Sequence, residues 1–474
     1  MPAAARTAPY LVILAVYAAS RLVFAQAGVS FTYQQEITTY LQYLDVEQLR
    51  HHLLYSLFYL HSQPPLFNLL LGLSFKLFGD HWHTAMHFLF LLLGLVTNVA
   101  LFRVMRLLGI GAIAALCVTC VYMISPSQIL YENLLFYPYA VAALITIGAW
   151  CIAELACRRN RRWGHALAWT VAALCLLQGS FHPLLLALPF CAAGYVLGWR
   201  AAAKIISLPA LLVLAWYAKN VALFDVYSGS SWMGMNWSRV AINSLFNSQR
   251  EQLFEQTHDP LARIPAFLPP EKYQPFVALP PIGDIPVLSE AYKTGGAPNY
   301  NNALYILVSK RYAKLSWEAI RLFPDNYLHN VLVALCLAAA PSERYNYIGD
   351  NIHRIAGYAD WYDMLVWLSP YPFLPARNSY GPAYIMGLTP LFLFPVGLML
   401  CWLRCLQSGY WRTSPPRFWA LLYMTALPLY SLVVHSLFEI AENNRFRFDW
   451  EPLLVAVIAL ALFQRRPGSP RENA

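Results

Sequence analysis

Long apolar segments alternate with short polar breaks over most of the chain, and many of these segments approach 20 residues. Runs of this length cross a bilayer as helices. We predict ten spans, in chain order over 9–27, 82–107, 109–126, 134–157, 163–180, 183–199, 202–223, 384–404, 417–437 and 451–464. The first is expected to be an anchor and not a removed signal peptide, because no small-residue cleavage site follows it. The pattern therefore predicts an all-α, multi-span helical bundle.

Arginine clusters beside the apolar segments predict the sidedness of the bundle. The largest cluster surrounds Asn160 and consists of Arg158, Arg159, Arg161 and Arg162. Such clusters stay in the cytoplasm. We therefore expect both termini to be cytoplasmic and two sizeable regions, 28–81 and 224–383, to lie on the outer side.

Two stretches leave the number of spans open. Segment 65–78 is short, begins with Pro65 and carries Lys76, so we expect an interfacial or re-entrant helix. Segment 326–341 is either a short crossing paired with 357–375, which gives twelve spans, or a helix on the outer surface. Both alternatives leave the orientation of the C-terminal spans unchanged.

The region 224–383 has the composition of a loop-rich subdomain. Seven prolines lie between 265 and 286 and Gly295-Gly296 follows them, which argues against long regular elements before Ala303. From Ala303 to Leu322 the apolar positions fit one face of a helix. We predict three parts: a transmembrane module over 1–223 with the outer loop 28–81, an extracytoplasmic subdomain over 224–383, and C-terminal helices over 384–474.

Composition supports a membrane protein. Of the 474 residues, 58% are hydrophobic and 12% are charged, and the mean hydropathy is +0.44. Soluble domains carry about 25% charged residues. The net charge of +9 requires no nucleic-acid partner, because most arginines lie beside apolar segments. Cys117 and Cys120 form a CxxC spacing inside an apolar segment, and we interpret them as buried hydrophobes.

Acidic residues of the first outer loop are candidates for catalysis. Glu36 lies four positions before Tyr40, and Asp45 and Glu47 follow. If 36–55 is one surface helix, Glu36, Tyr40 and Glu47 lie near one stripe. A carboxylate there can deprotonate an acceptor hydroxyl; the alternative is an amphipathic helix whose acids face water.

Two further outer segments carry charge. Glu132 follows Ser125-Pro126 between two spans, where an acid can also cap a helix. The late run 438–454 holds Glu439, Glu442, Arg445, Arg447 and Asp449. Arginines on the outer side run against the positive-inside tendency, so they indicate either a phosphate-bearing lipid, which suits the guanidinium fork, or an internal ion-pair network.

Other candidate residues have structural explanations. Lys219 lies where a span emerges, and snorkelling alone accounts for it. Six histidines crowd between 51 and 87, but no pair has the HExxH spacing, so we expect no metal. No nucleotide-binding or GxSxG motif is present, and we expect no cofactor.

In chain order, these motifs resemble those of the GT-C glycosyltransferases, above all the protein O-mannosyltransferase and lipid A aminoarabinose transferase group. Glu36 and Tyr40 hold the acid and tyrosine positions of the first outer loop, and Glu132 matches the second-loop acid. The remaining matches are Gln63-Pro64-Pro65-Leu66, His182-Pro183, Trp216, Lys219, Asn220, Ser231, Gly234, Asn236, Glu442, Arg445, Phe446, Arg447 and Pro452. Glu36 stands where the family has aspartate, and Gln63 replaces a cation.

The resemblance implies a GT-C fold of about 10–12 spans. It also implies an inverting enzyme that moves a monosaccharide from a polyprenyl-phosphate donor to a glycan, lipid or protein acceptor, at the outer face of a bacterial inner membrane. Within it the catalytic candidates are Glu36, Asp45 and Glu132. The candidates for the donor phosphate are Arg445, Arg447 and Lys219, and those for the rest of the substrate are Tyr40, Gln63, His182 and Glu442.

Two other functions remain as alternatives. A transporter or flippase for a lipid-linked substrate predicts charges deep inside spans and broken helices at the midplane, whereas the acids here cluster in outer loops. A non-catalytic protein that keeps the fold for lipid binding is the second alternative. A transfer assay with a labelled polyprenyl-phosphate sugar distinguishes such a non-catalytic protein from an enzyme.

Overall fold

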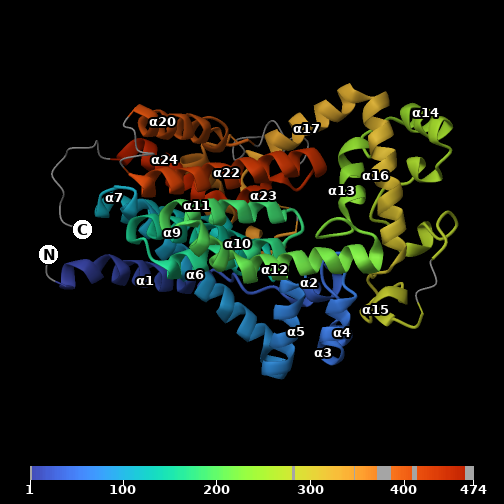
Figure 1. The fold of residues 1–474 in the computed structure, drawn as a ribbon, viewed down its shortest axis with the longest axis horizontal. Helices are drawn as coiled ribbons and strands as arrows, with labels where there is room; N and C mark the ends of the chain where they lie inside the picture. The colour runs from blue at the N-terminus through green and yellow to red at the C-terminus, as the bar shows by residue number, and fades with distance from the viewer. Residues whose placement is uncertain (1–2, 280–282, 346, 371–385, 408–413, 465–474) are drawn as a thin grey trace.

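The computed structural model describes residues 3–279, 283–345, 347–370, 386–407 and 414–464. Within these ranges the chain is helical and contains no β-strand, only three isolated bridges. Figure 1 shows a bundle of roughly horizontal helices with a smaller group of helices at its right-hand end. The predicted all-α fold class is confirmed.

Each of the ten predicted spans coincides with a helix. The helices are α1 (Ala3–Gln26), α6 (Trp82–Leu107), α7 (Ala112–Met123), α9 (Pro138–Arg158), α10 (Arg161–Leu177), α11 (Ala187–Leu197), α12 (Trp199–Phe224), α20 (Phe394–Gln407), α22 (Pro415–Phe438) and α24 (Glu451–Phe463). Within the described residues, six helical stretches are long and apolar enough to cross a membrane by themselves. The count rises to seven if α7 and α8 (Pro126–Glu132), which meet at 55°, form one span.

The segments for which the sequence left membrane crossing undecided differ in structure. Helix α5 (Leu66–Phe78) joins α6 through a short turn, Gly79–His81, and packs back against it. Helix α17 (Pro324–Ala338) has 15 residues, packs against α22 and α23 (Asn443–Phe448), and is not among the spanning candidates. Segment 357–375 contains α19 (Ala356–Tyr362) and the turn Asp363–Trp367, and its end lies outside the described residues.

The first outer loop is not one surface helix, so that conditional prediction is wrong. It forms three short helices: α2 (Gln34–Thr39), α3 (Val46–His51) and α4 (Leu53–Phe58). Tyr40 ends α2 because its backbone is extended, with φ −63° and ψ 131°. Asp45 begins α3 by accepting a hydrogen bond from the Glu47 amide at 3.0 Å. Because Glu36 and Glu47 lie on different short helices, they do not share one face: Glu36 is buried, whereas the Glu47 side chain is 60% exposed.

The second outer region has a hydrophobic core of its own. Short helices α13 (Met233–Ala241), α14 (Asn247–Thr257) and α15 (Pro286–Ser289) precede α16 (Leu304–Leu322), which fulfils the prediction of a helix over 303–322. Buried Trp232, Leu253, Tyr305 and Tyr312 belong to this core. In Figure 1 these helices lie together at the right of the bundle, with α16 running across the direction of the spans.

Candidate functional site

Arg445 on α23 is the centre of a buried ion-pair chain. Its Nε and Nη2 lie 3.0 and 2.9 Å from Glu442 Oε2, and the Tyr345 hydroxyl donates to the same oxygen at 3.2 Å. The other oxygen, Oε1, faces Arg239 Nη1 at 3.4 Å, and Arg239 also pairs with Glu439 at 2.7 Å. Arg445 Nη1 is buried and, by distance and angle, donates no hydrogen bond to a described residue, although the Tyr137 phenol lies close enough to feel the guanidinium. Arg445 thus keeps one donor for a further acceptor.

Tyr40 connects the first outer loop to this chain. Its ring lies 5.0 Å from the ring of Phe136, and Arg445 Cζ lies 5.2 Å from the same ring. The Tyr40 hydroxyl donates to the Tyr347 carbonyl at 3.3 Å. Glu36, one turn before Tyr40, is buried; its carbonyl accepts from the Tyr40 amide at 3.0 Å, and its carboxylate forms no hydrogen bond or ion pair with any described residue.

The charges of these groups shift the pKa values of their neighbours. Burial raises the pKa of the Tyr40 phenol, the charge of Glu36 raises it further, and the charge of Arg445 opposes this. The guanidinium of Arg445 and that of Arg239 hold the pKa of Glu442 below its ordinary value in spite of burial. The charges of Glu36, Glu442 and Arg445 therefore all act on one phenol.

Asp45 has a different environment from Glu36. Its carboxylate caps α3 and also accepts hydrogen bonds from the Thr294 amide at 2.5 Å and the Thr294 hydroxyl at 2.8 Å. Next to Thr294, Lys293 Nζ donates to the Tyr40 carbonyl at 2.8 Å. Both contacts tie the 293–294 turn of the subdomain to the first outer loop. Asp45 is thus committed to holding the loop in place.

His61 forms the second connection between the subdomain and this loop. Its Nδ1 lies 2.8 Å from the Ser231 hydroxyl, and its Nε2 lies 2.9 Å from the Asn301 carbonyl oxygen. Asn301 Oδ1 in turn accepts from the His61 and Ser62 amides. Burial lowers the pKa of His61 to about 3, so the ring is neutral. The arrangement is a structural joint.

Lys219 lies beside this joint and not beside Arg445. Its Nζ donates to the Leu60 carbonyl and lies 3.5 Å from the Trp216 ring centroid. Gln63 is half-buried and has no side-chain hydrogen bond with a described residue. His182 is exposed; its Nδ1 caps the following turn, and its amide donates to the Tyr430 hydroxyl at 3.0 Å. These three predicted residues are not brought into contact with Glu36 or Arg445.

Glu132 lies inside the bundle in a closed network. Arg21 of α1 contacts both carboxylate oxygens, at 2.8 and 2.7 Å, and the hydroxyls of Tyr17 and Tyr139 donate to Oε2. A Cβ on Gly94 would lie 2.4 Å from Glu132 Oε2, so the glycine makes room for the network. The side chain of Glu132 is 0% exposed. Glu132 is thus held inside the bundle by Arg21, Tyr17 and Tyr139, and its catalytic role stays a prediction.

Arg447 is also internal. Its side chain is 0% exposed, its Nη2 lies 3.2 Å from Glu451 Oε2, and its guanidinium lies over the Trp367 ring. Glu451 accepts further hydrogen bonds from the hydroxyls of Ser127 and Ser342. Of the two late arginines, only Arg445 belongs to the cluster with Tyr40.

The structure thus brings Glu36, Tyr40, Glu442 and Arg445 together and separates the other predicted residues from them. Residues that sequence reasoning missed complete the cluster: Arg239, Phe136 and Tyr345. Arg239 lies on α13 but is not itself part of a motif, and aromatic residues are common throughout the chain. Among the described residues, no group of three His, Cys, Asp or Glu side chains is placed to hold a metal.

No protein-family model matches this chain, and no curated protein matches it. Solved structures of similar chain course include the archaeal oligosaccharyltransferase AglB from Archaeoglobus fulgidus, in complex with an inhibitory peptide and a dolichol-phosphate. It has 13% identity and a TM-score of 0.43, over 95% of this chain and 50% of that one. Another is ArnT from Cupriavidus metallidurans bound to undecaprenyl phosphate, with 13% identity and a TM-score of 0.33, over 96% and 77%.

Both proteins belong to the GT-C superfamily, the class that the sequence motifs indicated. This chain spans about half the length of AglB. At these identities and TM-scores the likeness assigns neither an activity nor a substrate to this chain.

Proposed function

We propose that this chain is a GT-C-type membrane glycosyltransferase. It takes a monosaccharide from a polyprenyl-phosphate donor and transfers it to a hydroxyl of a glycan, lipid or protein at the outer face of the membrane. The site lies between α2 and α23. The observation that supports it is the meeting of an unpaired carboxylate, Glu36, and a guanidinium with a spare donor, Arg445, at one phenol, Tyr40.

In the proposed reaction the Glu36 carboxylate accepts the proton of the acceptor hydroxyl while that oxygen attacks the anomeric carbon. The bond between the anomeric carbon and the phosphate oxygen breaks, and polyprenyl phosphate leaves with the electron pair. Attack from the face opposite the leaving group inverts the anomeric configuration.

Arg445 stabilises the charge that develops on the leaving phosphate. Glu442 Oε2 accepts a hydrogen bond from this guanidinium. Because Oε1 of the same carboxylate already faces Arg239, Glu442 can turn toward Arg239 and release Arg445 without losing a cationic partner. Arg239 therefore acts as a positioning residue for the donor site.

A transfer assay on the purified protein with a labelled polyprenyl-phosphate sugar tests the proposal, after glycan analysis of cells lacking the protein has identified the missing sugar. Glu36→Gln keeps the shape and removes the base, so turnover should fall by about 10²–10⁴-fold with donor binding preserved. Glu47→Gln is the matched control, because Glu47 lies in the same loop with an exposed side chain.

Three results would contradict the proposal or reassign the base. If Glu36→Gln keeps near-wild-type turnover and Asp45→Asn loses turnover, then Asp45 is the base. Activity in both variants removes this loop from catalysis. Donor binding by the wild-type protein without any transfer favours the non-catalytic lipid-binding alternative.

A further inference from the structure

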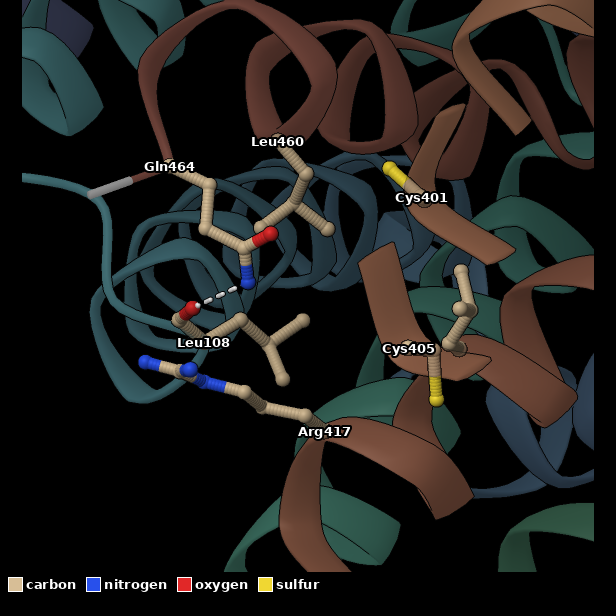
Figure 2. A pocket seen from close by; sticks show the side chains of 7 residues that line it. Leu108, Cys401, Cys405, Arg417, Leu460 and Gln464 are labelled. Atoms are coloured by element: carbon tan, nitrogen blue, oxygen red, sulfur yellow. Dashed lines mark hydrogen bonds between the residues drawn. The ribbon is translucent and has the colours of Figure 1, made fainter. Parts of the chain in front are cut away.

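The small pocket at the end of the bundle remote from α23 has no room for a substrate. Its walls come from the turn between α6 and α7 and from α20, α22 and α24 (Figure 2). Gln464 Nε2 donates to the Leu108 carbonyl at 3.1 Å and closes one side. The cavity volume of about 20 Å³ admits roughly one water molecule. This pocket is therefore no substrate site, unlike the surface beside the cluster around Arg445.

Tyr347 carries an exposed aromatic ring beside the cluster around Arg445. Tyr347 is 57% exposed, whereas Tyr345, in the cluster, is buried. The Tyr347 ring lies 6.2 Å from the Tyr40 ring, inclined at 81°, and 5.3 Å from the Tyr345 ring. Because the charges of Glu36 and Arg445 act on the Tyr40 phenol, the exposed ring borders the place where the base and the phosphate-binding guanidinium of the proposed reaction meet.

The segment that carries Tyr347 is anchored on both sides of this residue. Before it, the Tyr345 hydroxyl donates to Glu442 Oε2 at 3.2 Å. After it, the Asn351 side chain accepts from the Ser30 amide at 3.2 Å and donates to the Ser30 carbonyl at 2.8 Å. The backbone that presents the ring is thus fixed before a ligand binds, which lowers the entropic cost of binding.

The exposed side chains of α2, next to Tyr347, are polar and uncharged. Gln35 and Thr39 lie one turn apart on the exposed side of this helix. Neither 34–40 nor 347–351 contains a lysine or an arginine, so an anionic acceptor would meet no exposed cation there. Carboxamides and hydroxyls both donate and accept hydrogen bonds. These segments therefore favour a neutral ligand that carries hydroxyls.

We propose that the acceptor of the transfer is a neutral glycan, and that its terminal sugar ring lies against the Tyr347 ring. One face of a pyranose consists of C–H groups, which pack against the negative face of an aromatic ring, whereas its hydroxyls point outward from the edge. A sugar packed in this way directs a hydroxyl toward the Tyr40 phenol, where Glu36 accepts the proton. The inference rests on the proposed function and selects one of its three acceptor classes.

The class of acceptor is tested with envelope material extracted from cells that lack the protein, because this material holds the unmodified acceptor. One half is treated with periodate and then borohydride, which opens sugar rings between neighbouring hydroxyls. With the labelled polyprenyl-phosphate sugar, the purified wild-type protein should modify the untreated half and lose nearly all transfer to the treated half. Equal transfer to both halves overturns the inference, because the accepting hydroxyl then belongs to a lipid or a protein.

Tyr347→Leu tests the residue itself. The substitution removes the ring but keeps the backbone carbonyl that accepts the Tyr40 hydrogen bond, so the loop should stay in place. The KM for the acceptor should rise about five- to tenfold, while kcat and the KM for the donor stay near their wild-type values. Tyr347→Phe, which keeps an aromatic ring, should retain most of the affinity for the acceptor.

Tyr227→Leu is the matched control, because Tyr227 is 76% exposed just after the end of α12 and lies outside the cluster around Arg445. An equal rise of the acceptor KM in Tyr227→Leu would show a general surface effect and overturn the role of Tyr347. An unchanged acceptor KM in Tyr347→Leu overturns it as well. In both cases transfer by the wild-type protein leaves the proposed function standing. Absence of any transfer by the wild-type protein would instead overturn the proposed function, and the acceptor assignment with it.

Discussion

Tyr40 and Arg445 lie against the same aromatic ring, that of Phe136. The Tyr40 ring is 5.0 Å from it, inclined at 75°, and Arg445 Cζ is 5.2 Å from its centroid. The first outer loop, the connection before α9 and the last outer turn therefore meet at one place. Phe136, from the middle segment, supplies the surface against which Tyr40 of the first segment and Arg445 of the last segment both lie.

Arg445→Gln should weaken donor binding. Loss of a hydrogen bond to a charged group costs about 1.5–3 kcal/mol, which corresponds to about 10–150-fold in affinity. Both Arg445→Gln and Arg447→Gln should lower the melting temperature, because each removes the partner of a buried carboxylate, Glu442 or Glu451. Arg447→Gln should leave donor binding unchanged. Donor titration of both variants checks this. Weaker donor binding by Arg447→Gln at an unchanged melting temperature would return Arg447 to the donor site.

Gly94→Ala should destabilise the protein. The added Cβ would lie 2.2 to 2.5 Å from the hydroxyls of Tyr139 and Tyr17 and from Glu132 Oε2, which forces the buried network apart. Overpacking of this kind costs about 1–3 kcal/mol. Gly357→Ala is the control, because no atom lies within 4 Å of its added Cβ, and it should be neutral or slightly stabilising. Thermal unfolding in detergent measures both, and equal melting temperatures would disprove the steric argument.

The Lys293 contact predicts a pH dependence of stability. Burial lowers the pKa of Lys293 from 10.5 to about 8, and Asp45 opposes this. Between these two values the unfolded chain binds a proton that the folded chain does not, so the free energy of unfolding should rise with pH. The gain is roughly 3 kcal/mol across the window.

Lys293→Met isolates this contribution, because all other groups titrate alike in both proteins. The free energy of unfolding of the wild-type protein, relative to that of the variant, should increase from pH 8 to pH 10.5. A difference that stays constant over this range would show that Lys293 titrates normally in the folded protein.

Sidedness is testable with single cysteines in a cysteine-free background. A cysteine at position 296 should react with an impermeant maleimide in intact cells, whereas one at position 160 should react only after permeabilisation, because the surrounding arginines resist translocation. Native Cys157 is exposed near position 160, and restoring it alone in this background provides a second reporter. Labelling of position 160 in intact cells would contradict the predicted topology.

The sequence predicted the positions of the spans, since apolar length and arginine clusters are local signals. It also selected Glu36, Tyr40, Glu442 and Arg445 as candidate site residues, and their functional roles stay predictions. It did not indicate Phe136 and Arg239, which connect them, because neither belongs to a motif. The prediction that 36–55 could form one helix was wrong because residue periodicity reports only local structure. It contains no information on Thr294 and Lys293, which lie far along the chain and hydrogen-bond Asp45 and the Tyr40 carbonyl. Glu132 shows the converse, since its partner Arg21 lies in the apolar helix α1 and belongs to no motif.

The joint at His61 sets an order of events during biosynthesis. Asn301, which holds the His61 and Ser62 amides, lies 240 residues after His61. At about 5–20 residues per second, the first outer loop waits on the order of 10–50 s for its partner to be synthesised. During that time the short helices α2 to α4 lack the contacts that fix them. A nascent chain arrested before residue 301 should therefore expose this loop to protease, and one arrested well beyond it should not.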